Sequence, residues 1–189
     1  MNILILYTTL EGQTAKIAGQ IANNLRQKHH HVVTQAGDHL PGDFEPETYD
    51  AAIIGGPIHM GRYPRAMKKF VMQHNDWLNK NPSALFTVCM AINSQSPESR
   101  QQAINYAEKF ITETQWNPAK MVIFAGAVKY TQYGLITRYI MKRISKSEGG
   151  STDTSQDHEY TDWDDVKNFS LRFAEILEAA QADEVEISR

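Results

Sequence analysis

The stretch YTTLEGQT, residues 7–14, joins an apolar run to the first helical pattern of the chain. The apolar run, Asn2 to Tyr7, predicts a strand covered on both faces, and apolar residues then recur with helical period from about Thr14 to Lys28. Further strands are expected at His31 to Ala36, Ala51 to Gly56, Ala84 to Ala91 and Met121 to Ala127, with helical patterns between them. This strict alternation predicts an α/β fold with a doubly wound, five-stranded parallel sheet and helices on both faces.

The later helical patterns begin at recognisable start signals. Pro64 stands in the first turn of a helix that is expected to continue past Leu78, and Ser96 with Pro97 starts the next one. A last helix is expected from about Asp162 to Ala180. The sequence therefore predicts a single domain over residues 1–180, followed by a frayed tail over residues 181–189.

One segment, about residues 129–160, interrupts the alternation. It contains a helical pattern at about Tyr133 to Ser147 and then a loop rich in turn-forming residues. It is too short to form a domain of its own, so we interpret it as a helical insertion after the fifth strand.

The bulk composition is that of a soluble globular protein, with 189 residues of which 41% are hydrophobic and 22% charged. No signal-peptide pattern is visible, and the apolar runs are far shorter than the roughly 20 residues that span a bilayer. Cys89 is the only cysteine, so no internal disulfide can form and a reducing cytoplasm fits best. Nothing in the sequence indicates a nucleic-acid partner, and any membrane contact is expected to be peripheral.

The most specific chemical signal is again the stretch over residues 7–14. A glycine-containing turn that enters a helix offers backbone N–H groups and the positive end of the helix dipole to a phosphate. Thr9 and Thr14 can add hydroxyl donors, and Gly12 lets the backbone approach closely. The chain has neither the fingerprint of a dinucleotide pyrophosphate nor that of a nucleoside triphosphate. A terminal monophosphate ester is the remaining natural ligand, against the alternative of a plain strand-to-helix turn.

This loop resembles the phosphate loop of the flavodoxin superfamily, which implies strand order 2-1-3-4-5 and FMN as the cofactor. A narrower resemblance covers nearly the whole chain. It rests on Gly12-Gln13-Thr14, TQWNPAK around Trp116, AGAVKY at Ala125, GGSTDT at Gly149 and YTDW at Tyr160. Together these are similar to the bacterial menaquinone-dependent protoporphyrinogen IX dehydrogenases, which add an insertion after the fifth strand.

The resemblance implies FMN-dependent oxidation of protoporphyrinogen IX to protoporphyrin IX in haem biosynthesis, with menaquinone or ubiquinone as the acceptor. It places the cofactor-binding residues in the phosphate loop and in the loops after the third, fourth and fifth strands. They are Thr9, Leu10, Glu11, Gly12, Gln13, Thr14, Pro57, Ile58, His59, Met60, Gly61, Tyr63, Met90, Ala91, Ile92, Asn93, Gly126, Ala127 and Tyr130. Cys89, Tyr106, Trp116 and Trp163 are expected in the core. No carboxylate pair, catalytic triad or metal cluster appears at a suitable spacing, so no catalytic residue is assigned and no metal is expected.

The insertion carries an unusual charge. Residues 121–147 contain five basic and no acidic residues, and removing this +5 block from the net charge of −3 leaves −8 for the rest. On the helical pattern, Arg138, Lys142, Arg143 and Lys146 are candidates for contact with substrate propionates or with an anionic membrane surface. We therefore expect a cytoplasmic protein that associates peripherally with the inner membrane, although a merely solvated helix face would give the same pattern.

Two other functions remain open at this level. An electron-carrier flavodoxin would dock on redox proteins, but such carriers are usually strongly acidic and enclose the flavin between aromatic rings. A soluble quinone reductase would need a nicotinamide site, and the sequence shows none.

Overall fold

The computed structural model of this chain describes residues 1–132, 151 and 153–187. Its centre is a five-stranded, all-parallel sheet in the order β2-β1-β3-β4-β5. The strands are β1 (Asn2–Tyr7), β2 (His31–Ala36), β3 (Ala51–Pro57), β4 (Ser83–Val88) and β5 (Lys120–Phe124). The expected doubly wound sheet and its strand order are confirmed.

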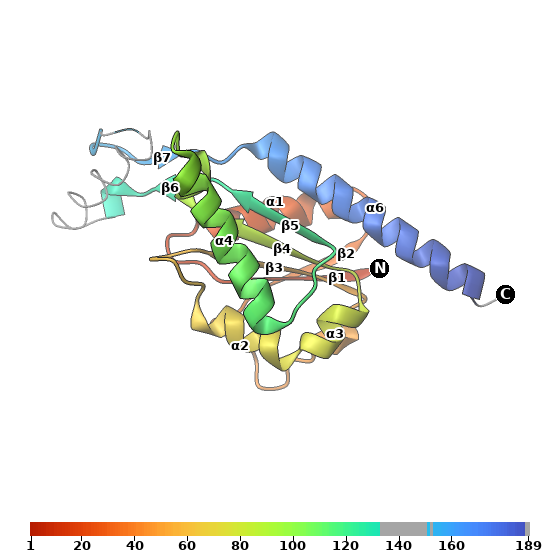
Figure 1. Ribbon diagram of the computed structural model, residues 1–189. Coiled ribbons are helices and arrows are strands. Elements are labelled where there is room, and N and C mark those ends of the chain that lie inside the picture. The colour runs from red at the N-terminus through yellow and green to blue at the C-terminus, as the bar shows by residue number, and fades with distance from the viewer. Residues whose placement is uncertain (133–150, 152, 188–189) are drawn as a thin grey trace.

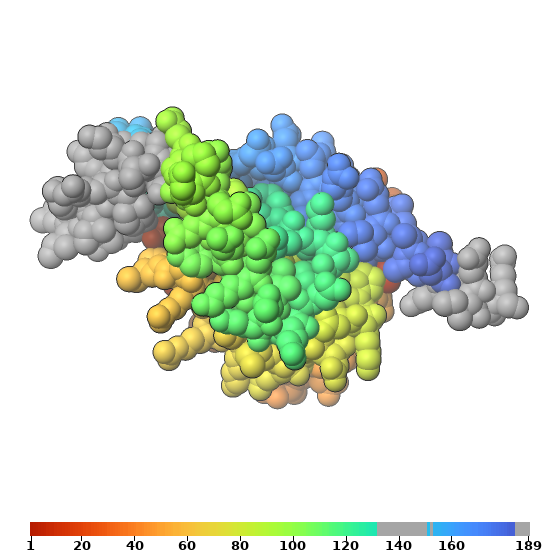
Figure 2. Space-filling model, in the orientation of Figure 1, coloured from red at the N-terminus to blue at the C-terminus, as the bar shows by residue number. Residues whose placement is uncertain are grey.

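Helices cover both faces of this sheet (Figure 1). One face carries α1 (Gln13–Arg26) and α6 (Trp163–Ile187), and the other carries α2 (Arg65–Gln73), α3 (Asn75–Lys80) and α4 (Pro97–Thr114). Short 3-10 turns lie at Pro46–Thr48, Met90–Asn93 and Tyr130–Gln132. In the space-filling view, the green α4 lies in front of the sheet, and the bluish-green segment around the edge strand β5 is visible between α4 and the blue α6 (Figure 2).

The alternation of side chains in β1 explains why the fold has two cores. Ile3 and Ile5 point to the α1–α6 side, whereas Leu4 and Leu6 point to the α2–α4 side, and all four are fully buried. Each such side chain contributes roughly 1.5–3 kcal/mol when it is removed from water. A strand that is apolar at every position can be satisfied only between two layers of helices.

Several boundaries differ from the expectation. β5 ends at Phe124 rather than Ala127, which belongs to the separate short strand Ala127–Val128. β4 ends at Val88 rather than Ala91, because the chain turns at once into the 3-10 helix Met90–Asn93. The single helix expected from Pro64 to Leu78 is divided at His74, and in its second part the Trp77 indole donates to the Tyr49 carbonyl (3.3 Å).

At the C-terminus, the expected frayed tail is helical over its described part, since α6 continues to Ile187. The segment EILEAAQADE, residues 175–184, consists mostly of strong helix formers, which extend the helix beyond the last core contact.

The two ends of the insertion pair with each other. The strands β6 (Ala127–Val128) and β7 (His158–Glu159) form a short antiparallel ladder beside the carboxyl end of β5. The helical pattern expected at 133–147, with its basic residues, lies outside the described residues. Within the described ranges, none of the helices combines the length and the apolar character needed to cross a membrane.

Candidate functional site

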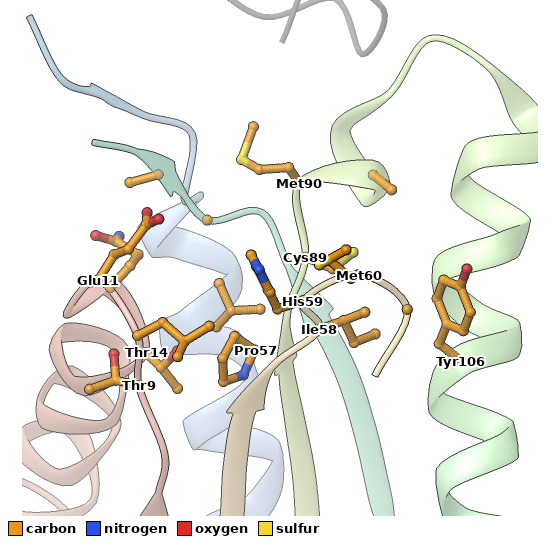
Figure 3. A pocket seen from close by; sticks show the side chains of 17 residues that line it. Thr9, Glu11, Thr14, Pro57, Ile58, His59, Met60, Cys89, Met90 and Tyr106 are labelled. Atoms are coloured by element: carbon orange, nitrogen blue, oxygen red, sulfur yellow. The ribbon is translucent and has the colours of Figure 1, made fainter. Parts of the chain in front are cut away.

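A cavity of about 350 Å³ opens beyond the carboxyl ends of β1, β3, β4 and β5 (Figure 3). It lies where the strand order reverses between β1 and β3, which is where open α/β sheets bind ligands. Its wall is formed by the phosphate loop, the loops after β3, β4 and β5, and one side chain of α4. The lining residues are Thr9, Leu10, Glu11, Gln13, Thr14, Pro57, Ile58, His59, Met60, Gly61, Val88, Cys89, Met90, Ala91, Tyr106, Gly126 and Ala127.

The phosphate loop is shaped by a left-handed glycine. Gly12 is the N-cap of α1 with φ +85°, a conformation that side chains other than glycine rarely adopt. Its N–H donates to the Thr9 hydroxyl oxygen (3.0 Å), which leaves the hydroxyl proton of Thr9 for another acceptor. The Gly12 carbonyl accepts the first helical bond, from Lys16 N–H (3.0 Å). The N–H groups of residues 13–15 therefore have no acceptor within the helix, which is the donor set that a phosphate requires.

The loop after β3 makes a tight hairpin turn beside the cavity. The backbones of His59 and Arg62 exchange two hydrogen bonds of 3.0 and 3.1 Å, and both intervening residues have positive φ, +49° at Met60 and +73° at Gly61. Two positive φ values are the signature of a type I′ turn. Met60 is 88% exposed, so this turn holds an apolar side chain at the cavity mouth.

The opposite wall comes from the segments after β4 and β5. Met90 and Ala91 begin the 3-10 turn after β4, while Gly126 and Ala127 follow β5. A Cβ at Gly126 would lie 2.9 Å from a methyl carbon of Val88, so only glycine lets the two segments come this close. These four positions are among those expected from the sequence, and they face the loop after β3 across the cavity.

Five of the predicted residues do not line the cavity. They are Gly12, Tyr63, Ile92, Asn93 and Tyr130. Gly12 acts through its backbone conformation, as described above. Tyr63 bonds to the Thr87 hydroxyl (2.7 Å) and packs on Phe110, with ring centroids 4.3 Å apart. Tyr130 is fully buried, and its hydroxyl donates to the Ser151 carbonyl (3.1 Å). The contacts that the structure gives these two tyrosines are structural.

Two lining residues were expected in the core. Tyr106 is partly exposed and faces the cavity from α4, so its assignment to the core is wrong. Cys89 is buried as expected, and it also forms part of the cavity wall. Trp116 is buried as expected, and Trp163 is partly buried against the α1–α6 core. Helical periodicity alone could not identify Tyr106, since it lies beside Ala103 and Phe110 on the buried side of α4.

A polar network ties the phosphate loop to the return of the insertion. The Gln13 amide donates to the Thr161 hydroxyl (2.8 Å), which in turn donates to the Ala125 carbonyl (2.7 Å). Lys16 pairs with Glu159 at 2.6 Å. Burial acts to raise the pKa of Glu159, but the hydrogen bonds from Lys16 and the Trp163 indole hold it below its ordinary value. The Glu159 carboxylate therefore braces α1 at the edge of the cavity.

Tyr63 makes the stability of the protein depend on pH. Burial raises the pKa of Tyr63 well above its ordinary value of 10.0, against the opposing effect of the Thr87 bond. Above pH 10 the unfolded state loses this proton while the folded state keeps it. The free energy of unfolding should thus fall by about 1.4 kcal/mol per pH unit there, and this loss should be absent below pH 10.

Replacing Tyr63 with phenylalanine should remove this component of the slope. At neutral pH the variant should be less stable by about 1–2 kcal/mol, because Thr87 is left buried without its partner. Denaturant unfolding of both proteins between about pH 8 and pH 11 measures the difference. If the free energy of unfolding falls equally steeply with pH in both proteins, Tyr63 is not the source of the pH dependence.

Comparison with known proteins agrees with this geometry. The family model of the flavodoxin domain matches residues 4–155. A protein named protoporphyrinogen IX dehydrogenase (quinone) from Escherichia coli K12 is 36% identical over 179 residues, which cover 94% of this chain and 97% of that one. The protein of the same name from Leishmania major is 30% identical over 174 residues, covering 92% of this chain and 74% of that one.

Solved structures show the same fold at lower identity. Oxidised flavodoxin 1 from Bacillus cereus superposes with a TM-score of 0.57 at 14% identity, covering 93% of this chain and 98% of that chain. A WrbA-like flavodoxin from Agrobacterium tumefaciens gives a TM-score of 0.51 at 14% identity, with 96% and 98% covered. The fold, the phosphate loop and the extent of the match to the curated relatives lead to one conclusion. The chain belongs to the flavodoxin-domain family and, within it, to the quinone-dependent protoporphyrinogen IX dehydrogenases.

Proposed function

We propose that this protein binds FMN in the cavity and uses it to oxidise protoporphyrinogen IX to protoporphyrin IX, with a quinone as the electron acceptor. The observation that carries the proposal is the 36% identity to a protein of this name over 94% of the chain, on a fold whose cavity suits a flavin. The complete oxidation removes six electrons and therefore takes three two-electron turnovers.

The residues present fit FMN. The phosphate ester would be held by the Thr9 hydroxyl, the N–H groups of Gln13 and Thr14, and the turn made by Gly12. The flavin ring would lie between the loop after β3, with Pro57 to Gly61, and the segment at Met90 and Ala91. When bound, FMN accepts electron pairs from the substrate and passes them to the quinone.

The cavity wall favours an enzyme over an electron carrier. Among the described lining residues, Tyr106 is the only Phe, Tyr or Trp, and it comes from α4 rather than from the loops after β3 and β4. Those loops offer His59, Met60 and Met90, which cover a ring less completely than aromatic side chains do. A less enclosed ring leaves room for a small-molecule substrate.

We also propose that the protein meets its quinone at an anionic membrane surface. The support is the basic block of the insertion, with Arg138, Lys142, Arg143 and Lys146. These residues lie outside the described part of the chain, so this proposal rests on the sequence.

An assay of porphyrin fluorescence tests both proposals. In one reaction, without oxygen, the yellow protein should convert protoporphyrinogen IX to the fluorescent porphyrin when menaquinone or ubiquinone is present. This rate should be about tenfold or more above the rate of a second reaction that contains oxygen and no quinone. Quinone presented in anionic vesicles should support faster turnover than quinone in neutral vesicles, and added salt should remove that advantage. Mass spectrometry should find FMN. A protein that reduces redox proteins but leaves the porphyrinogen unchanged would be an electron carrier instead.

A further inference from the structure

A second hollow, of about 280 Å³, lies beside the cavity, between the start of α2 and the side of α4 that carries Tyr106, Lys109 and Glu113. We call it the α2–α4 groove. Its lining residues are Gly61, Arg62, Tyr63, Arg65, Lys68, Tyr106, Lys109, Phe110 and Glu113. Figure 2 shows this side of the molecule, with long side chains of the segment around the start of α2, in orange to yellow, projecting beside the green α4.

The charges in the groove are unevenly matched. It has four cationic side chains and one carboxylate, and that carboxylate is already engaged. Glu113 pairs with Lys68 at 2.7 Å and with Lys109 at 3.7 Å, and the Lys68 hydrogen bond, with further help from Lys109, lowers the pKa of Glu113. Arg62 and Arg65 are exposed and form no ion pair with any residue that the structure describes. These two exposed guanidinium groups can therefore bind an external anion.

The groove and the cavity share a wall. Gly61 and Tyr106 line both. The Tyr106 ring lies so close over Gly61 that a Cβ there would be 2.9 Å from its hydroxyl oxygen. The Gln102 amide donates to the same hydroxyl (2.9 Å), which keeps the hydroxyl proton available as a donor. A ligand that lies over Met60 and Gly61 at the cavity mouth is therefore separated from the arginines only by the contact between Gly61 and Tyr106.

The cavity itself lacks the charge that its substrate needs. None of the described residues that line it is lysine or arginine, and Glu11 is acidic. A porphyrinogen has an apolar ring system with two propionate carboxylates on one edge. With FMN in the cavity, the apolar rings of the substrate would lie at the cavity mouth, and the carboxylates would need cations beside it. Arginine is the side chain best suited to them, because its planar fork binds a carboxylate through two parallel hydrogen bonds.

We propose that the α2–α4 groove binds the propionate carboxylates of the substrate through Arg62 and Arg65, and so orients the ring system over Gly61 towards the cavity. This inference rests on the proposed function, since it assigns the carboxylate subsite of the same reaction. Tyr106 closes the shared wall and offers its hydroxyl to the same edge of the ligand. The groove is a recess that adjoins the cavity across the Gly61–Tyr106 contact, which fits a subsite for part of one small molecule better than a flat lipid-binding face.

The test uses the FMN-loaded protein and the double variant Arg62→Gln/Arg65→Gln. Two substrates are compared in the same neutral detergent: protoporphyrinogen IX and its dimethyl ester, in which both carboxylates are neutral. The variant should raise the KM for the diacid about tenfold, through loss of charge-assisted hydrogen bonds, and leave its kcat unchanged. The KM for the ester should change less than about twofold. The variant Arg62→Lys/Arg65→Lys should restore part of the loss, because charge returns without the planar fork.

The matched control is Lys28→Gln/Lys80→Gln, which removes the same charge from exposed positions just before β2 and β4, at the amino ends of the strands and away from the cavity. It should leave both KM values unchanged. The FMN content and the melting temperature of every variant should be measured to check that each one folds. A double variant with equal KM changes for diacid and ester, or with none, would overturn the proposal. So would a variant that loses only its binding to anionic vesicles, since the arginines would then contact lipid.

A binding measurement keeps this inference separate from the proposed function. The affinity for the product, protoporphyrin IX, and for its dimethyl ester can be followed by porphyrin fluorescence without turnover. If the wild type oxidises no porphyrinogen, the proposed function fails. The groove is then still judged by whether Arg62→Gln/Arg65→Gln weakens binding of the diacid but not of the ester.

Discussion

Replacing Gly12 with aspartate should abolish FMN binding, whereas replacing it with asparagine should leave most of the affinity. The two side chains have nearly the same shape, and both have about the same strain in the left-handed conformation that Gly12 adopts at φ +85°. No atom lies within 4 Å of a Cβ built there, so neither replacement meets a clash. The difference between them is one negative charge next to a phosphate. At about 4 Å and an effective dielectric constant of about 20, that repulsion is about 4 kcal/mol, or roughly a thousandfold in affinity.

The same substitution should not harm the fold. A negative charge at the N-terminus of α1 interacts favourably with the helix dipole, by about 0.3–1 kcal/mol. A side chain at φ +85° costs about 1 kcal/mol of backbone strain, which the helix dipole offsets in part for aspartate. The FMN-free aspartate variant should therefore melt at or above the temperature of the FMN-free asparagine variant. Quenching of FMN fluorescence on titration measures affinity, and calorimetry measures melting. Wild-type affinity in the aspartate variant would place the phosphate elsewhere, and an equal loss in the asparagine variant would show that backbone geometry matters rather than charge.

The largest expected effect on stability is at Gly55, in the buried centre of β3. A Cβ at this position would lie 1.9 Å from the ring of Phe86 on the neighbouring strand β4. The ring is fully buried and cannot move outward, so Gly55→Ala should lower the free energy of unfolding by about 3 kcal/mol. The Gly55 carbonyl also accepts the Thr8 N–H (3.0 Å), so a shift of β3 should weaken FMN binding as well.

Two partner variants make this result specific. Gly19 lies inside α1, where a Cβ would meet nothing within 4 Å, and Gly19→Ala should raise stability by about 1 kcal/mol through helix propensity. Phe86→Leu in the Gly55→Ala background should recover part of the loss, since a smaller side chain makes room. Urea unfolding of the four proteins measures all three differences. Loss of stability without recovery in the double variant would mean that the damage is not the contact with Phe86.

The central part of the fold could be read from the sequence because its strands are apolar at nearly every position. β1 and β2 begin and end at the expected residues. The end of β4 could not be read, because the apolar run continues through Cys89, Met90 and Ala91 after the strand has ended. A hydrophobic pattern indicates which residues are buried, but it does not indicate whether the backbone is still extended.

The candidate site also has a part that the sequence predicts and a part that it does not. The loops that follow β1, β3, β4 and β5 could be assigned in advance, because topology alone brings the carboxyl ends of parallel strands together. Tyr106 and the α2–α4 groove could not, since they depend on how α4 packs on the start of α2. Gly61 and Tyr106 are far apart in the sequence, and no local pattern in either segment signals the contact.

The ladder between β6 and β7 bears on how such a chain can diverge. Because Ala127 pairs with Glu159 and Val128 with His158, the insertion leaves and re-enters the domain at neighbouring points, and Thr161 fixes the return to the Ala125 carbonyl. The entropy of closing a loop grows only slowly with length, by about 0.6 kcal/mol for each doubling. Residues can be added between these strands at little cost to the folded domain, provided that the buried Tyr130 keeps its place. Variation in the length of this segment can therefore accumulate while the phosphate loop stays as it is.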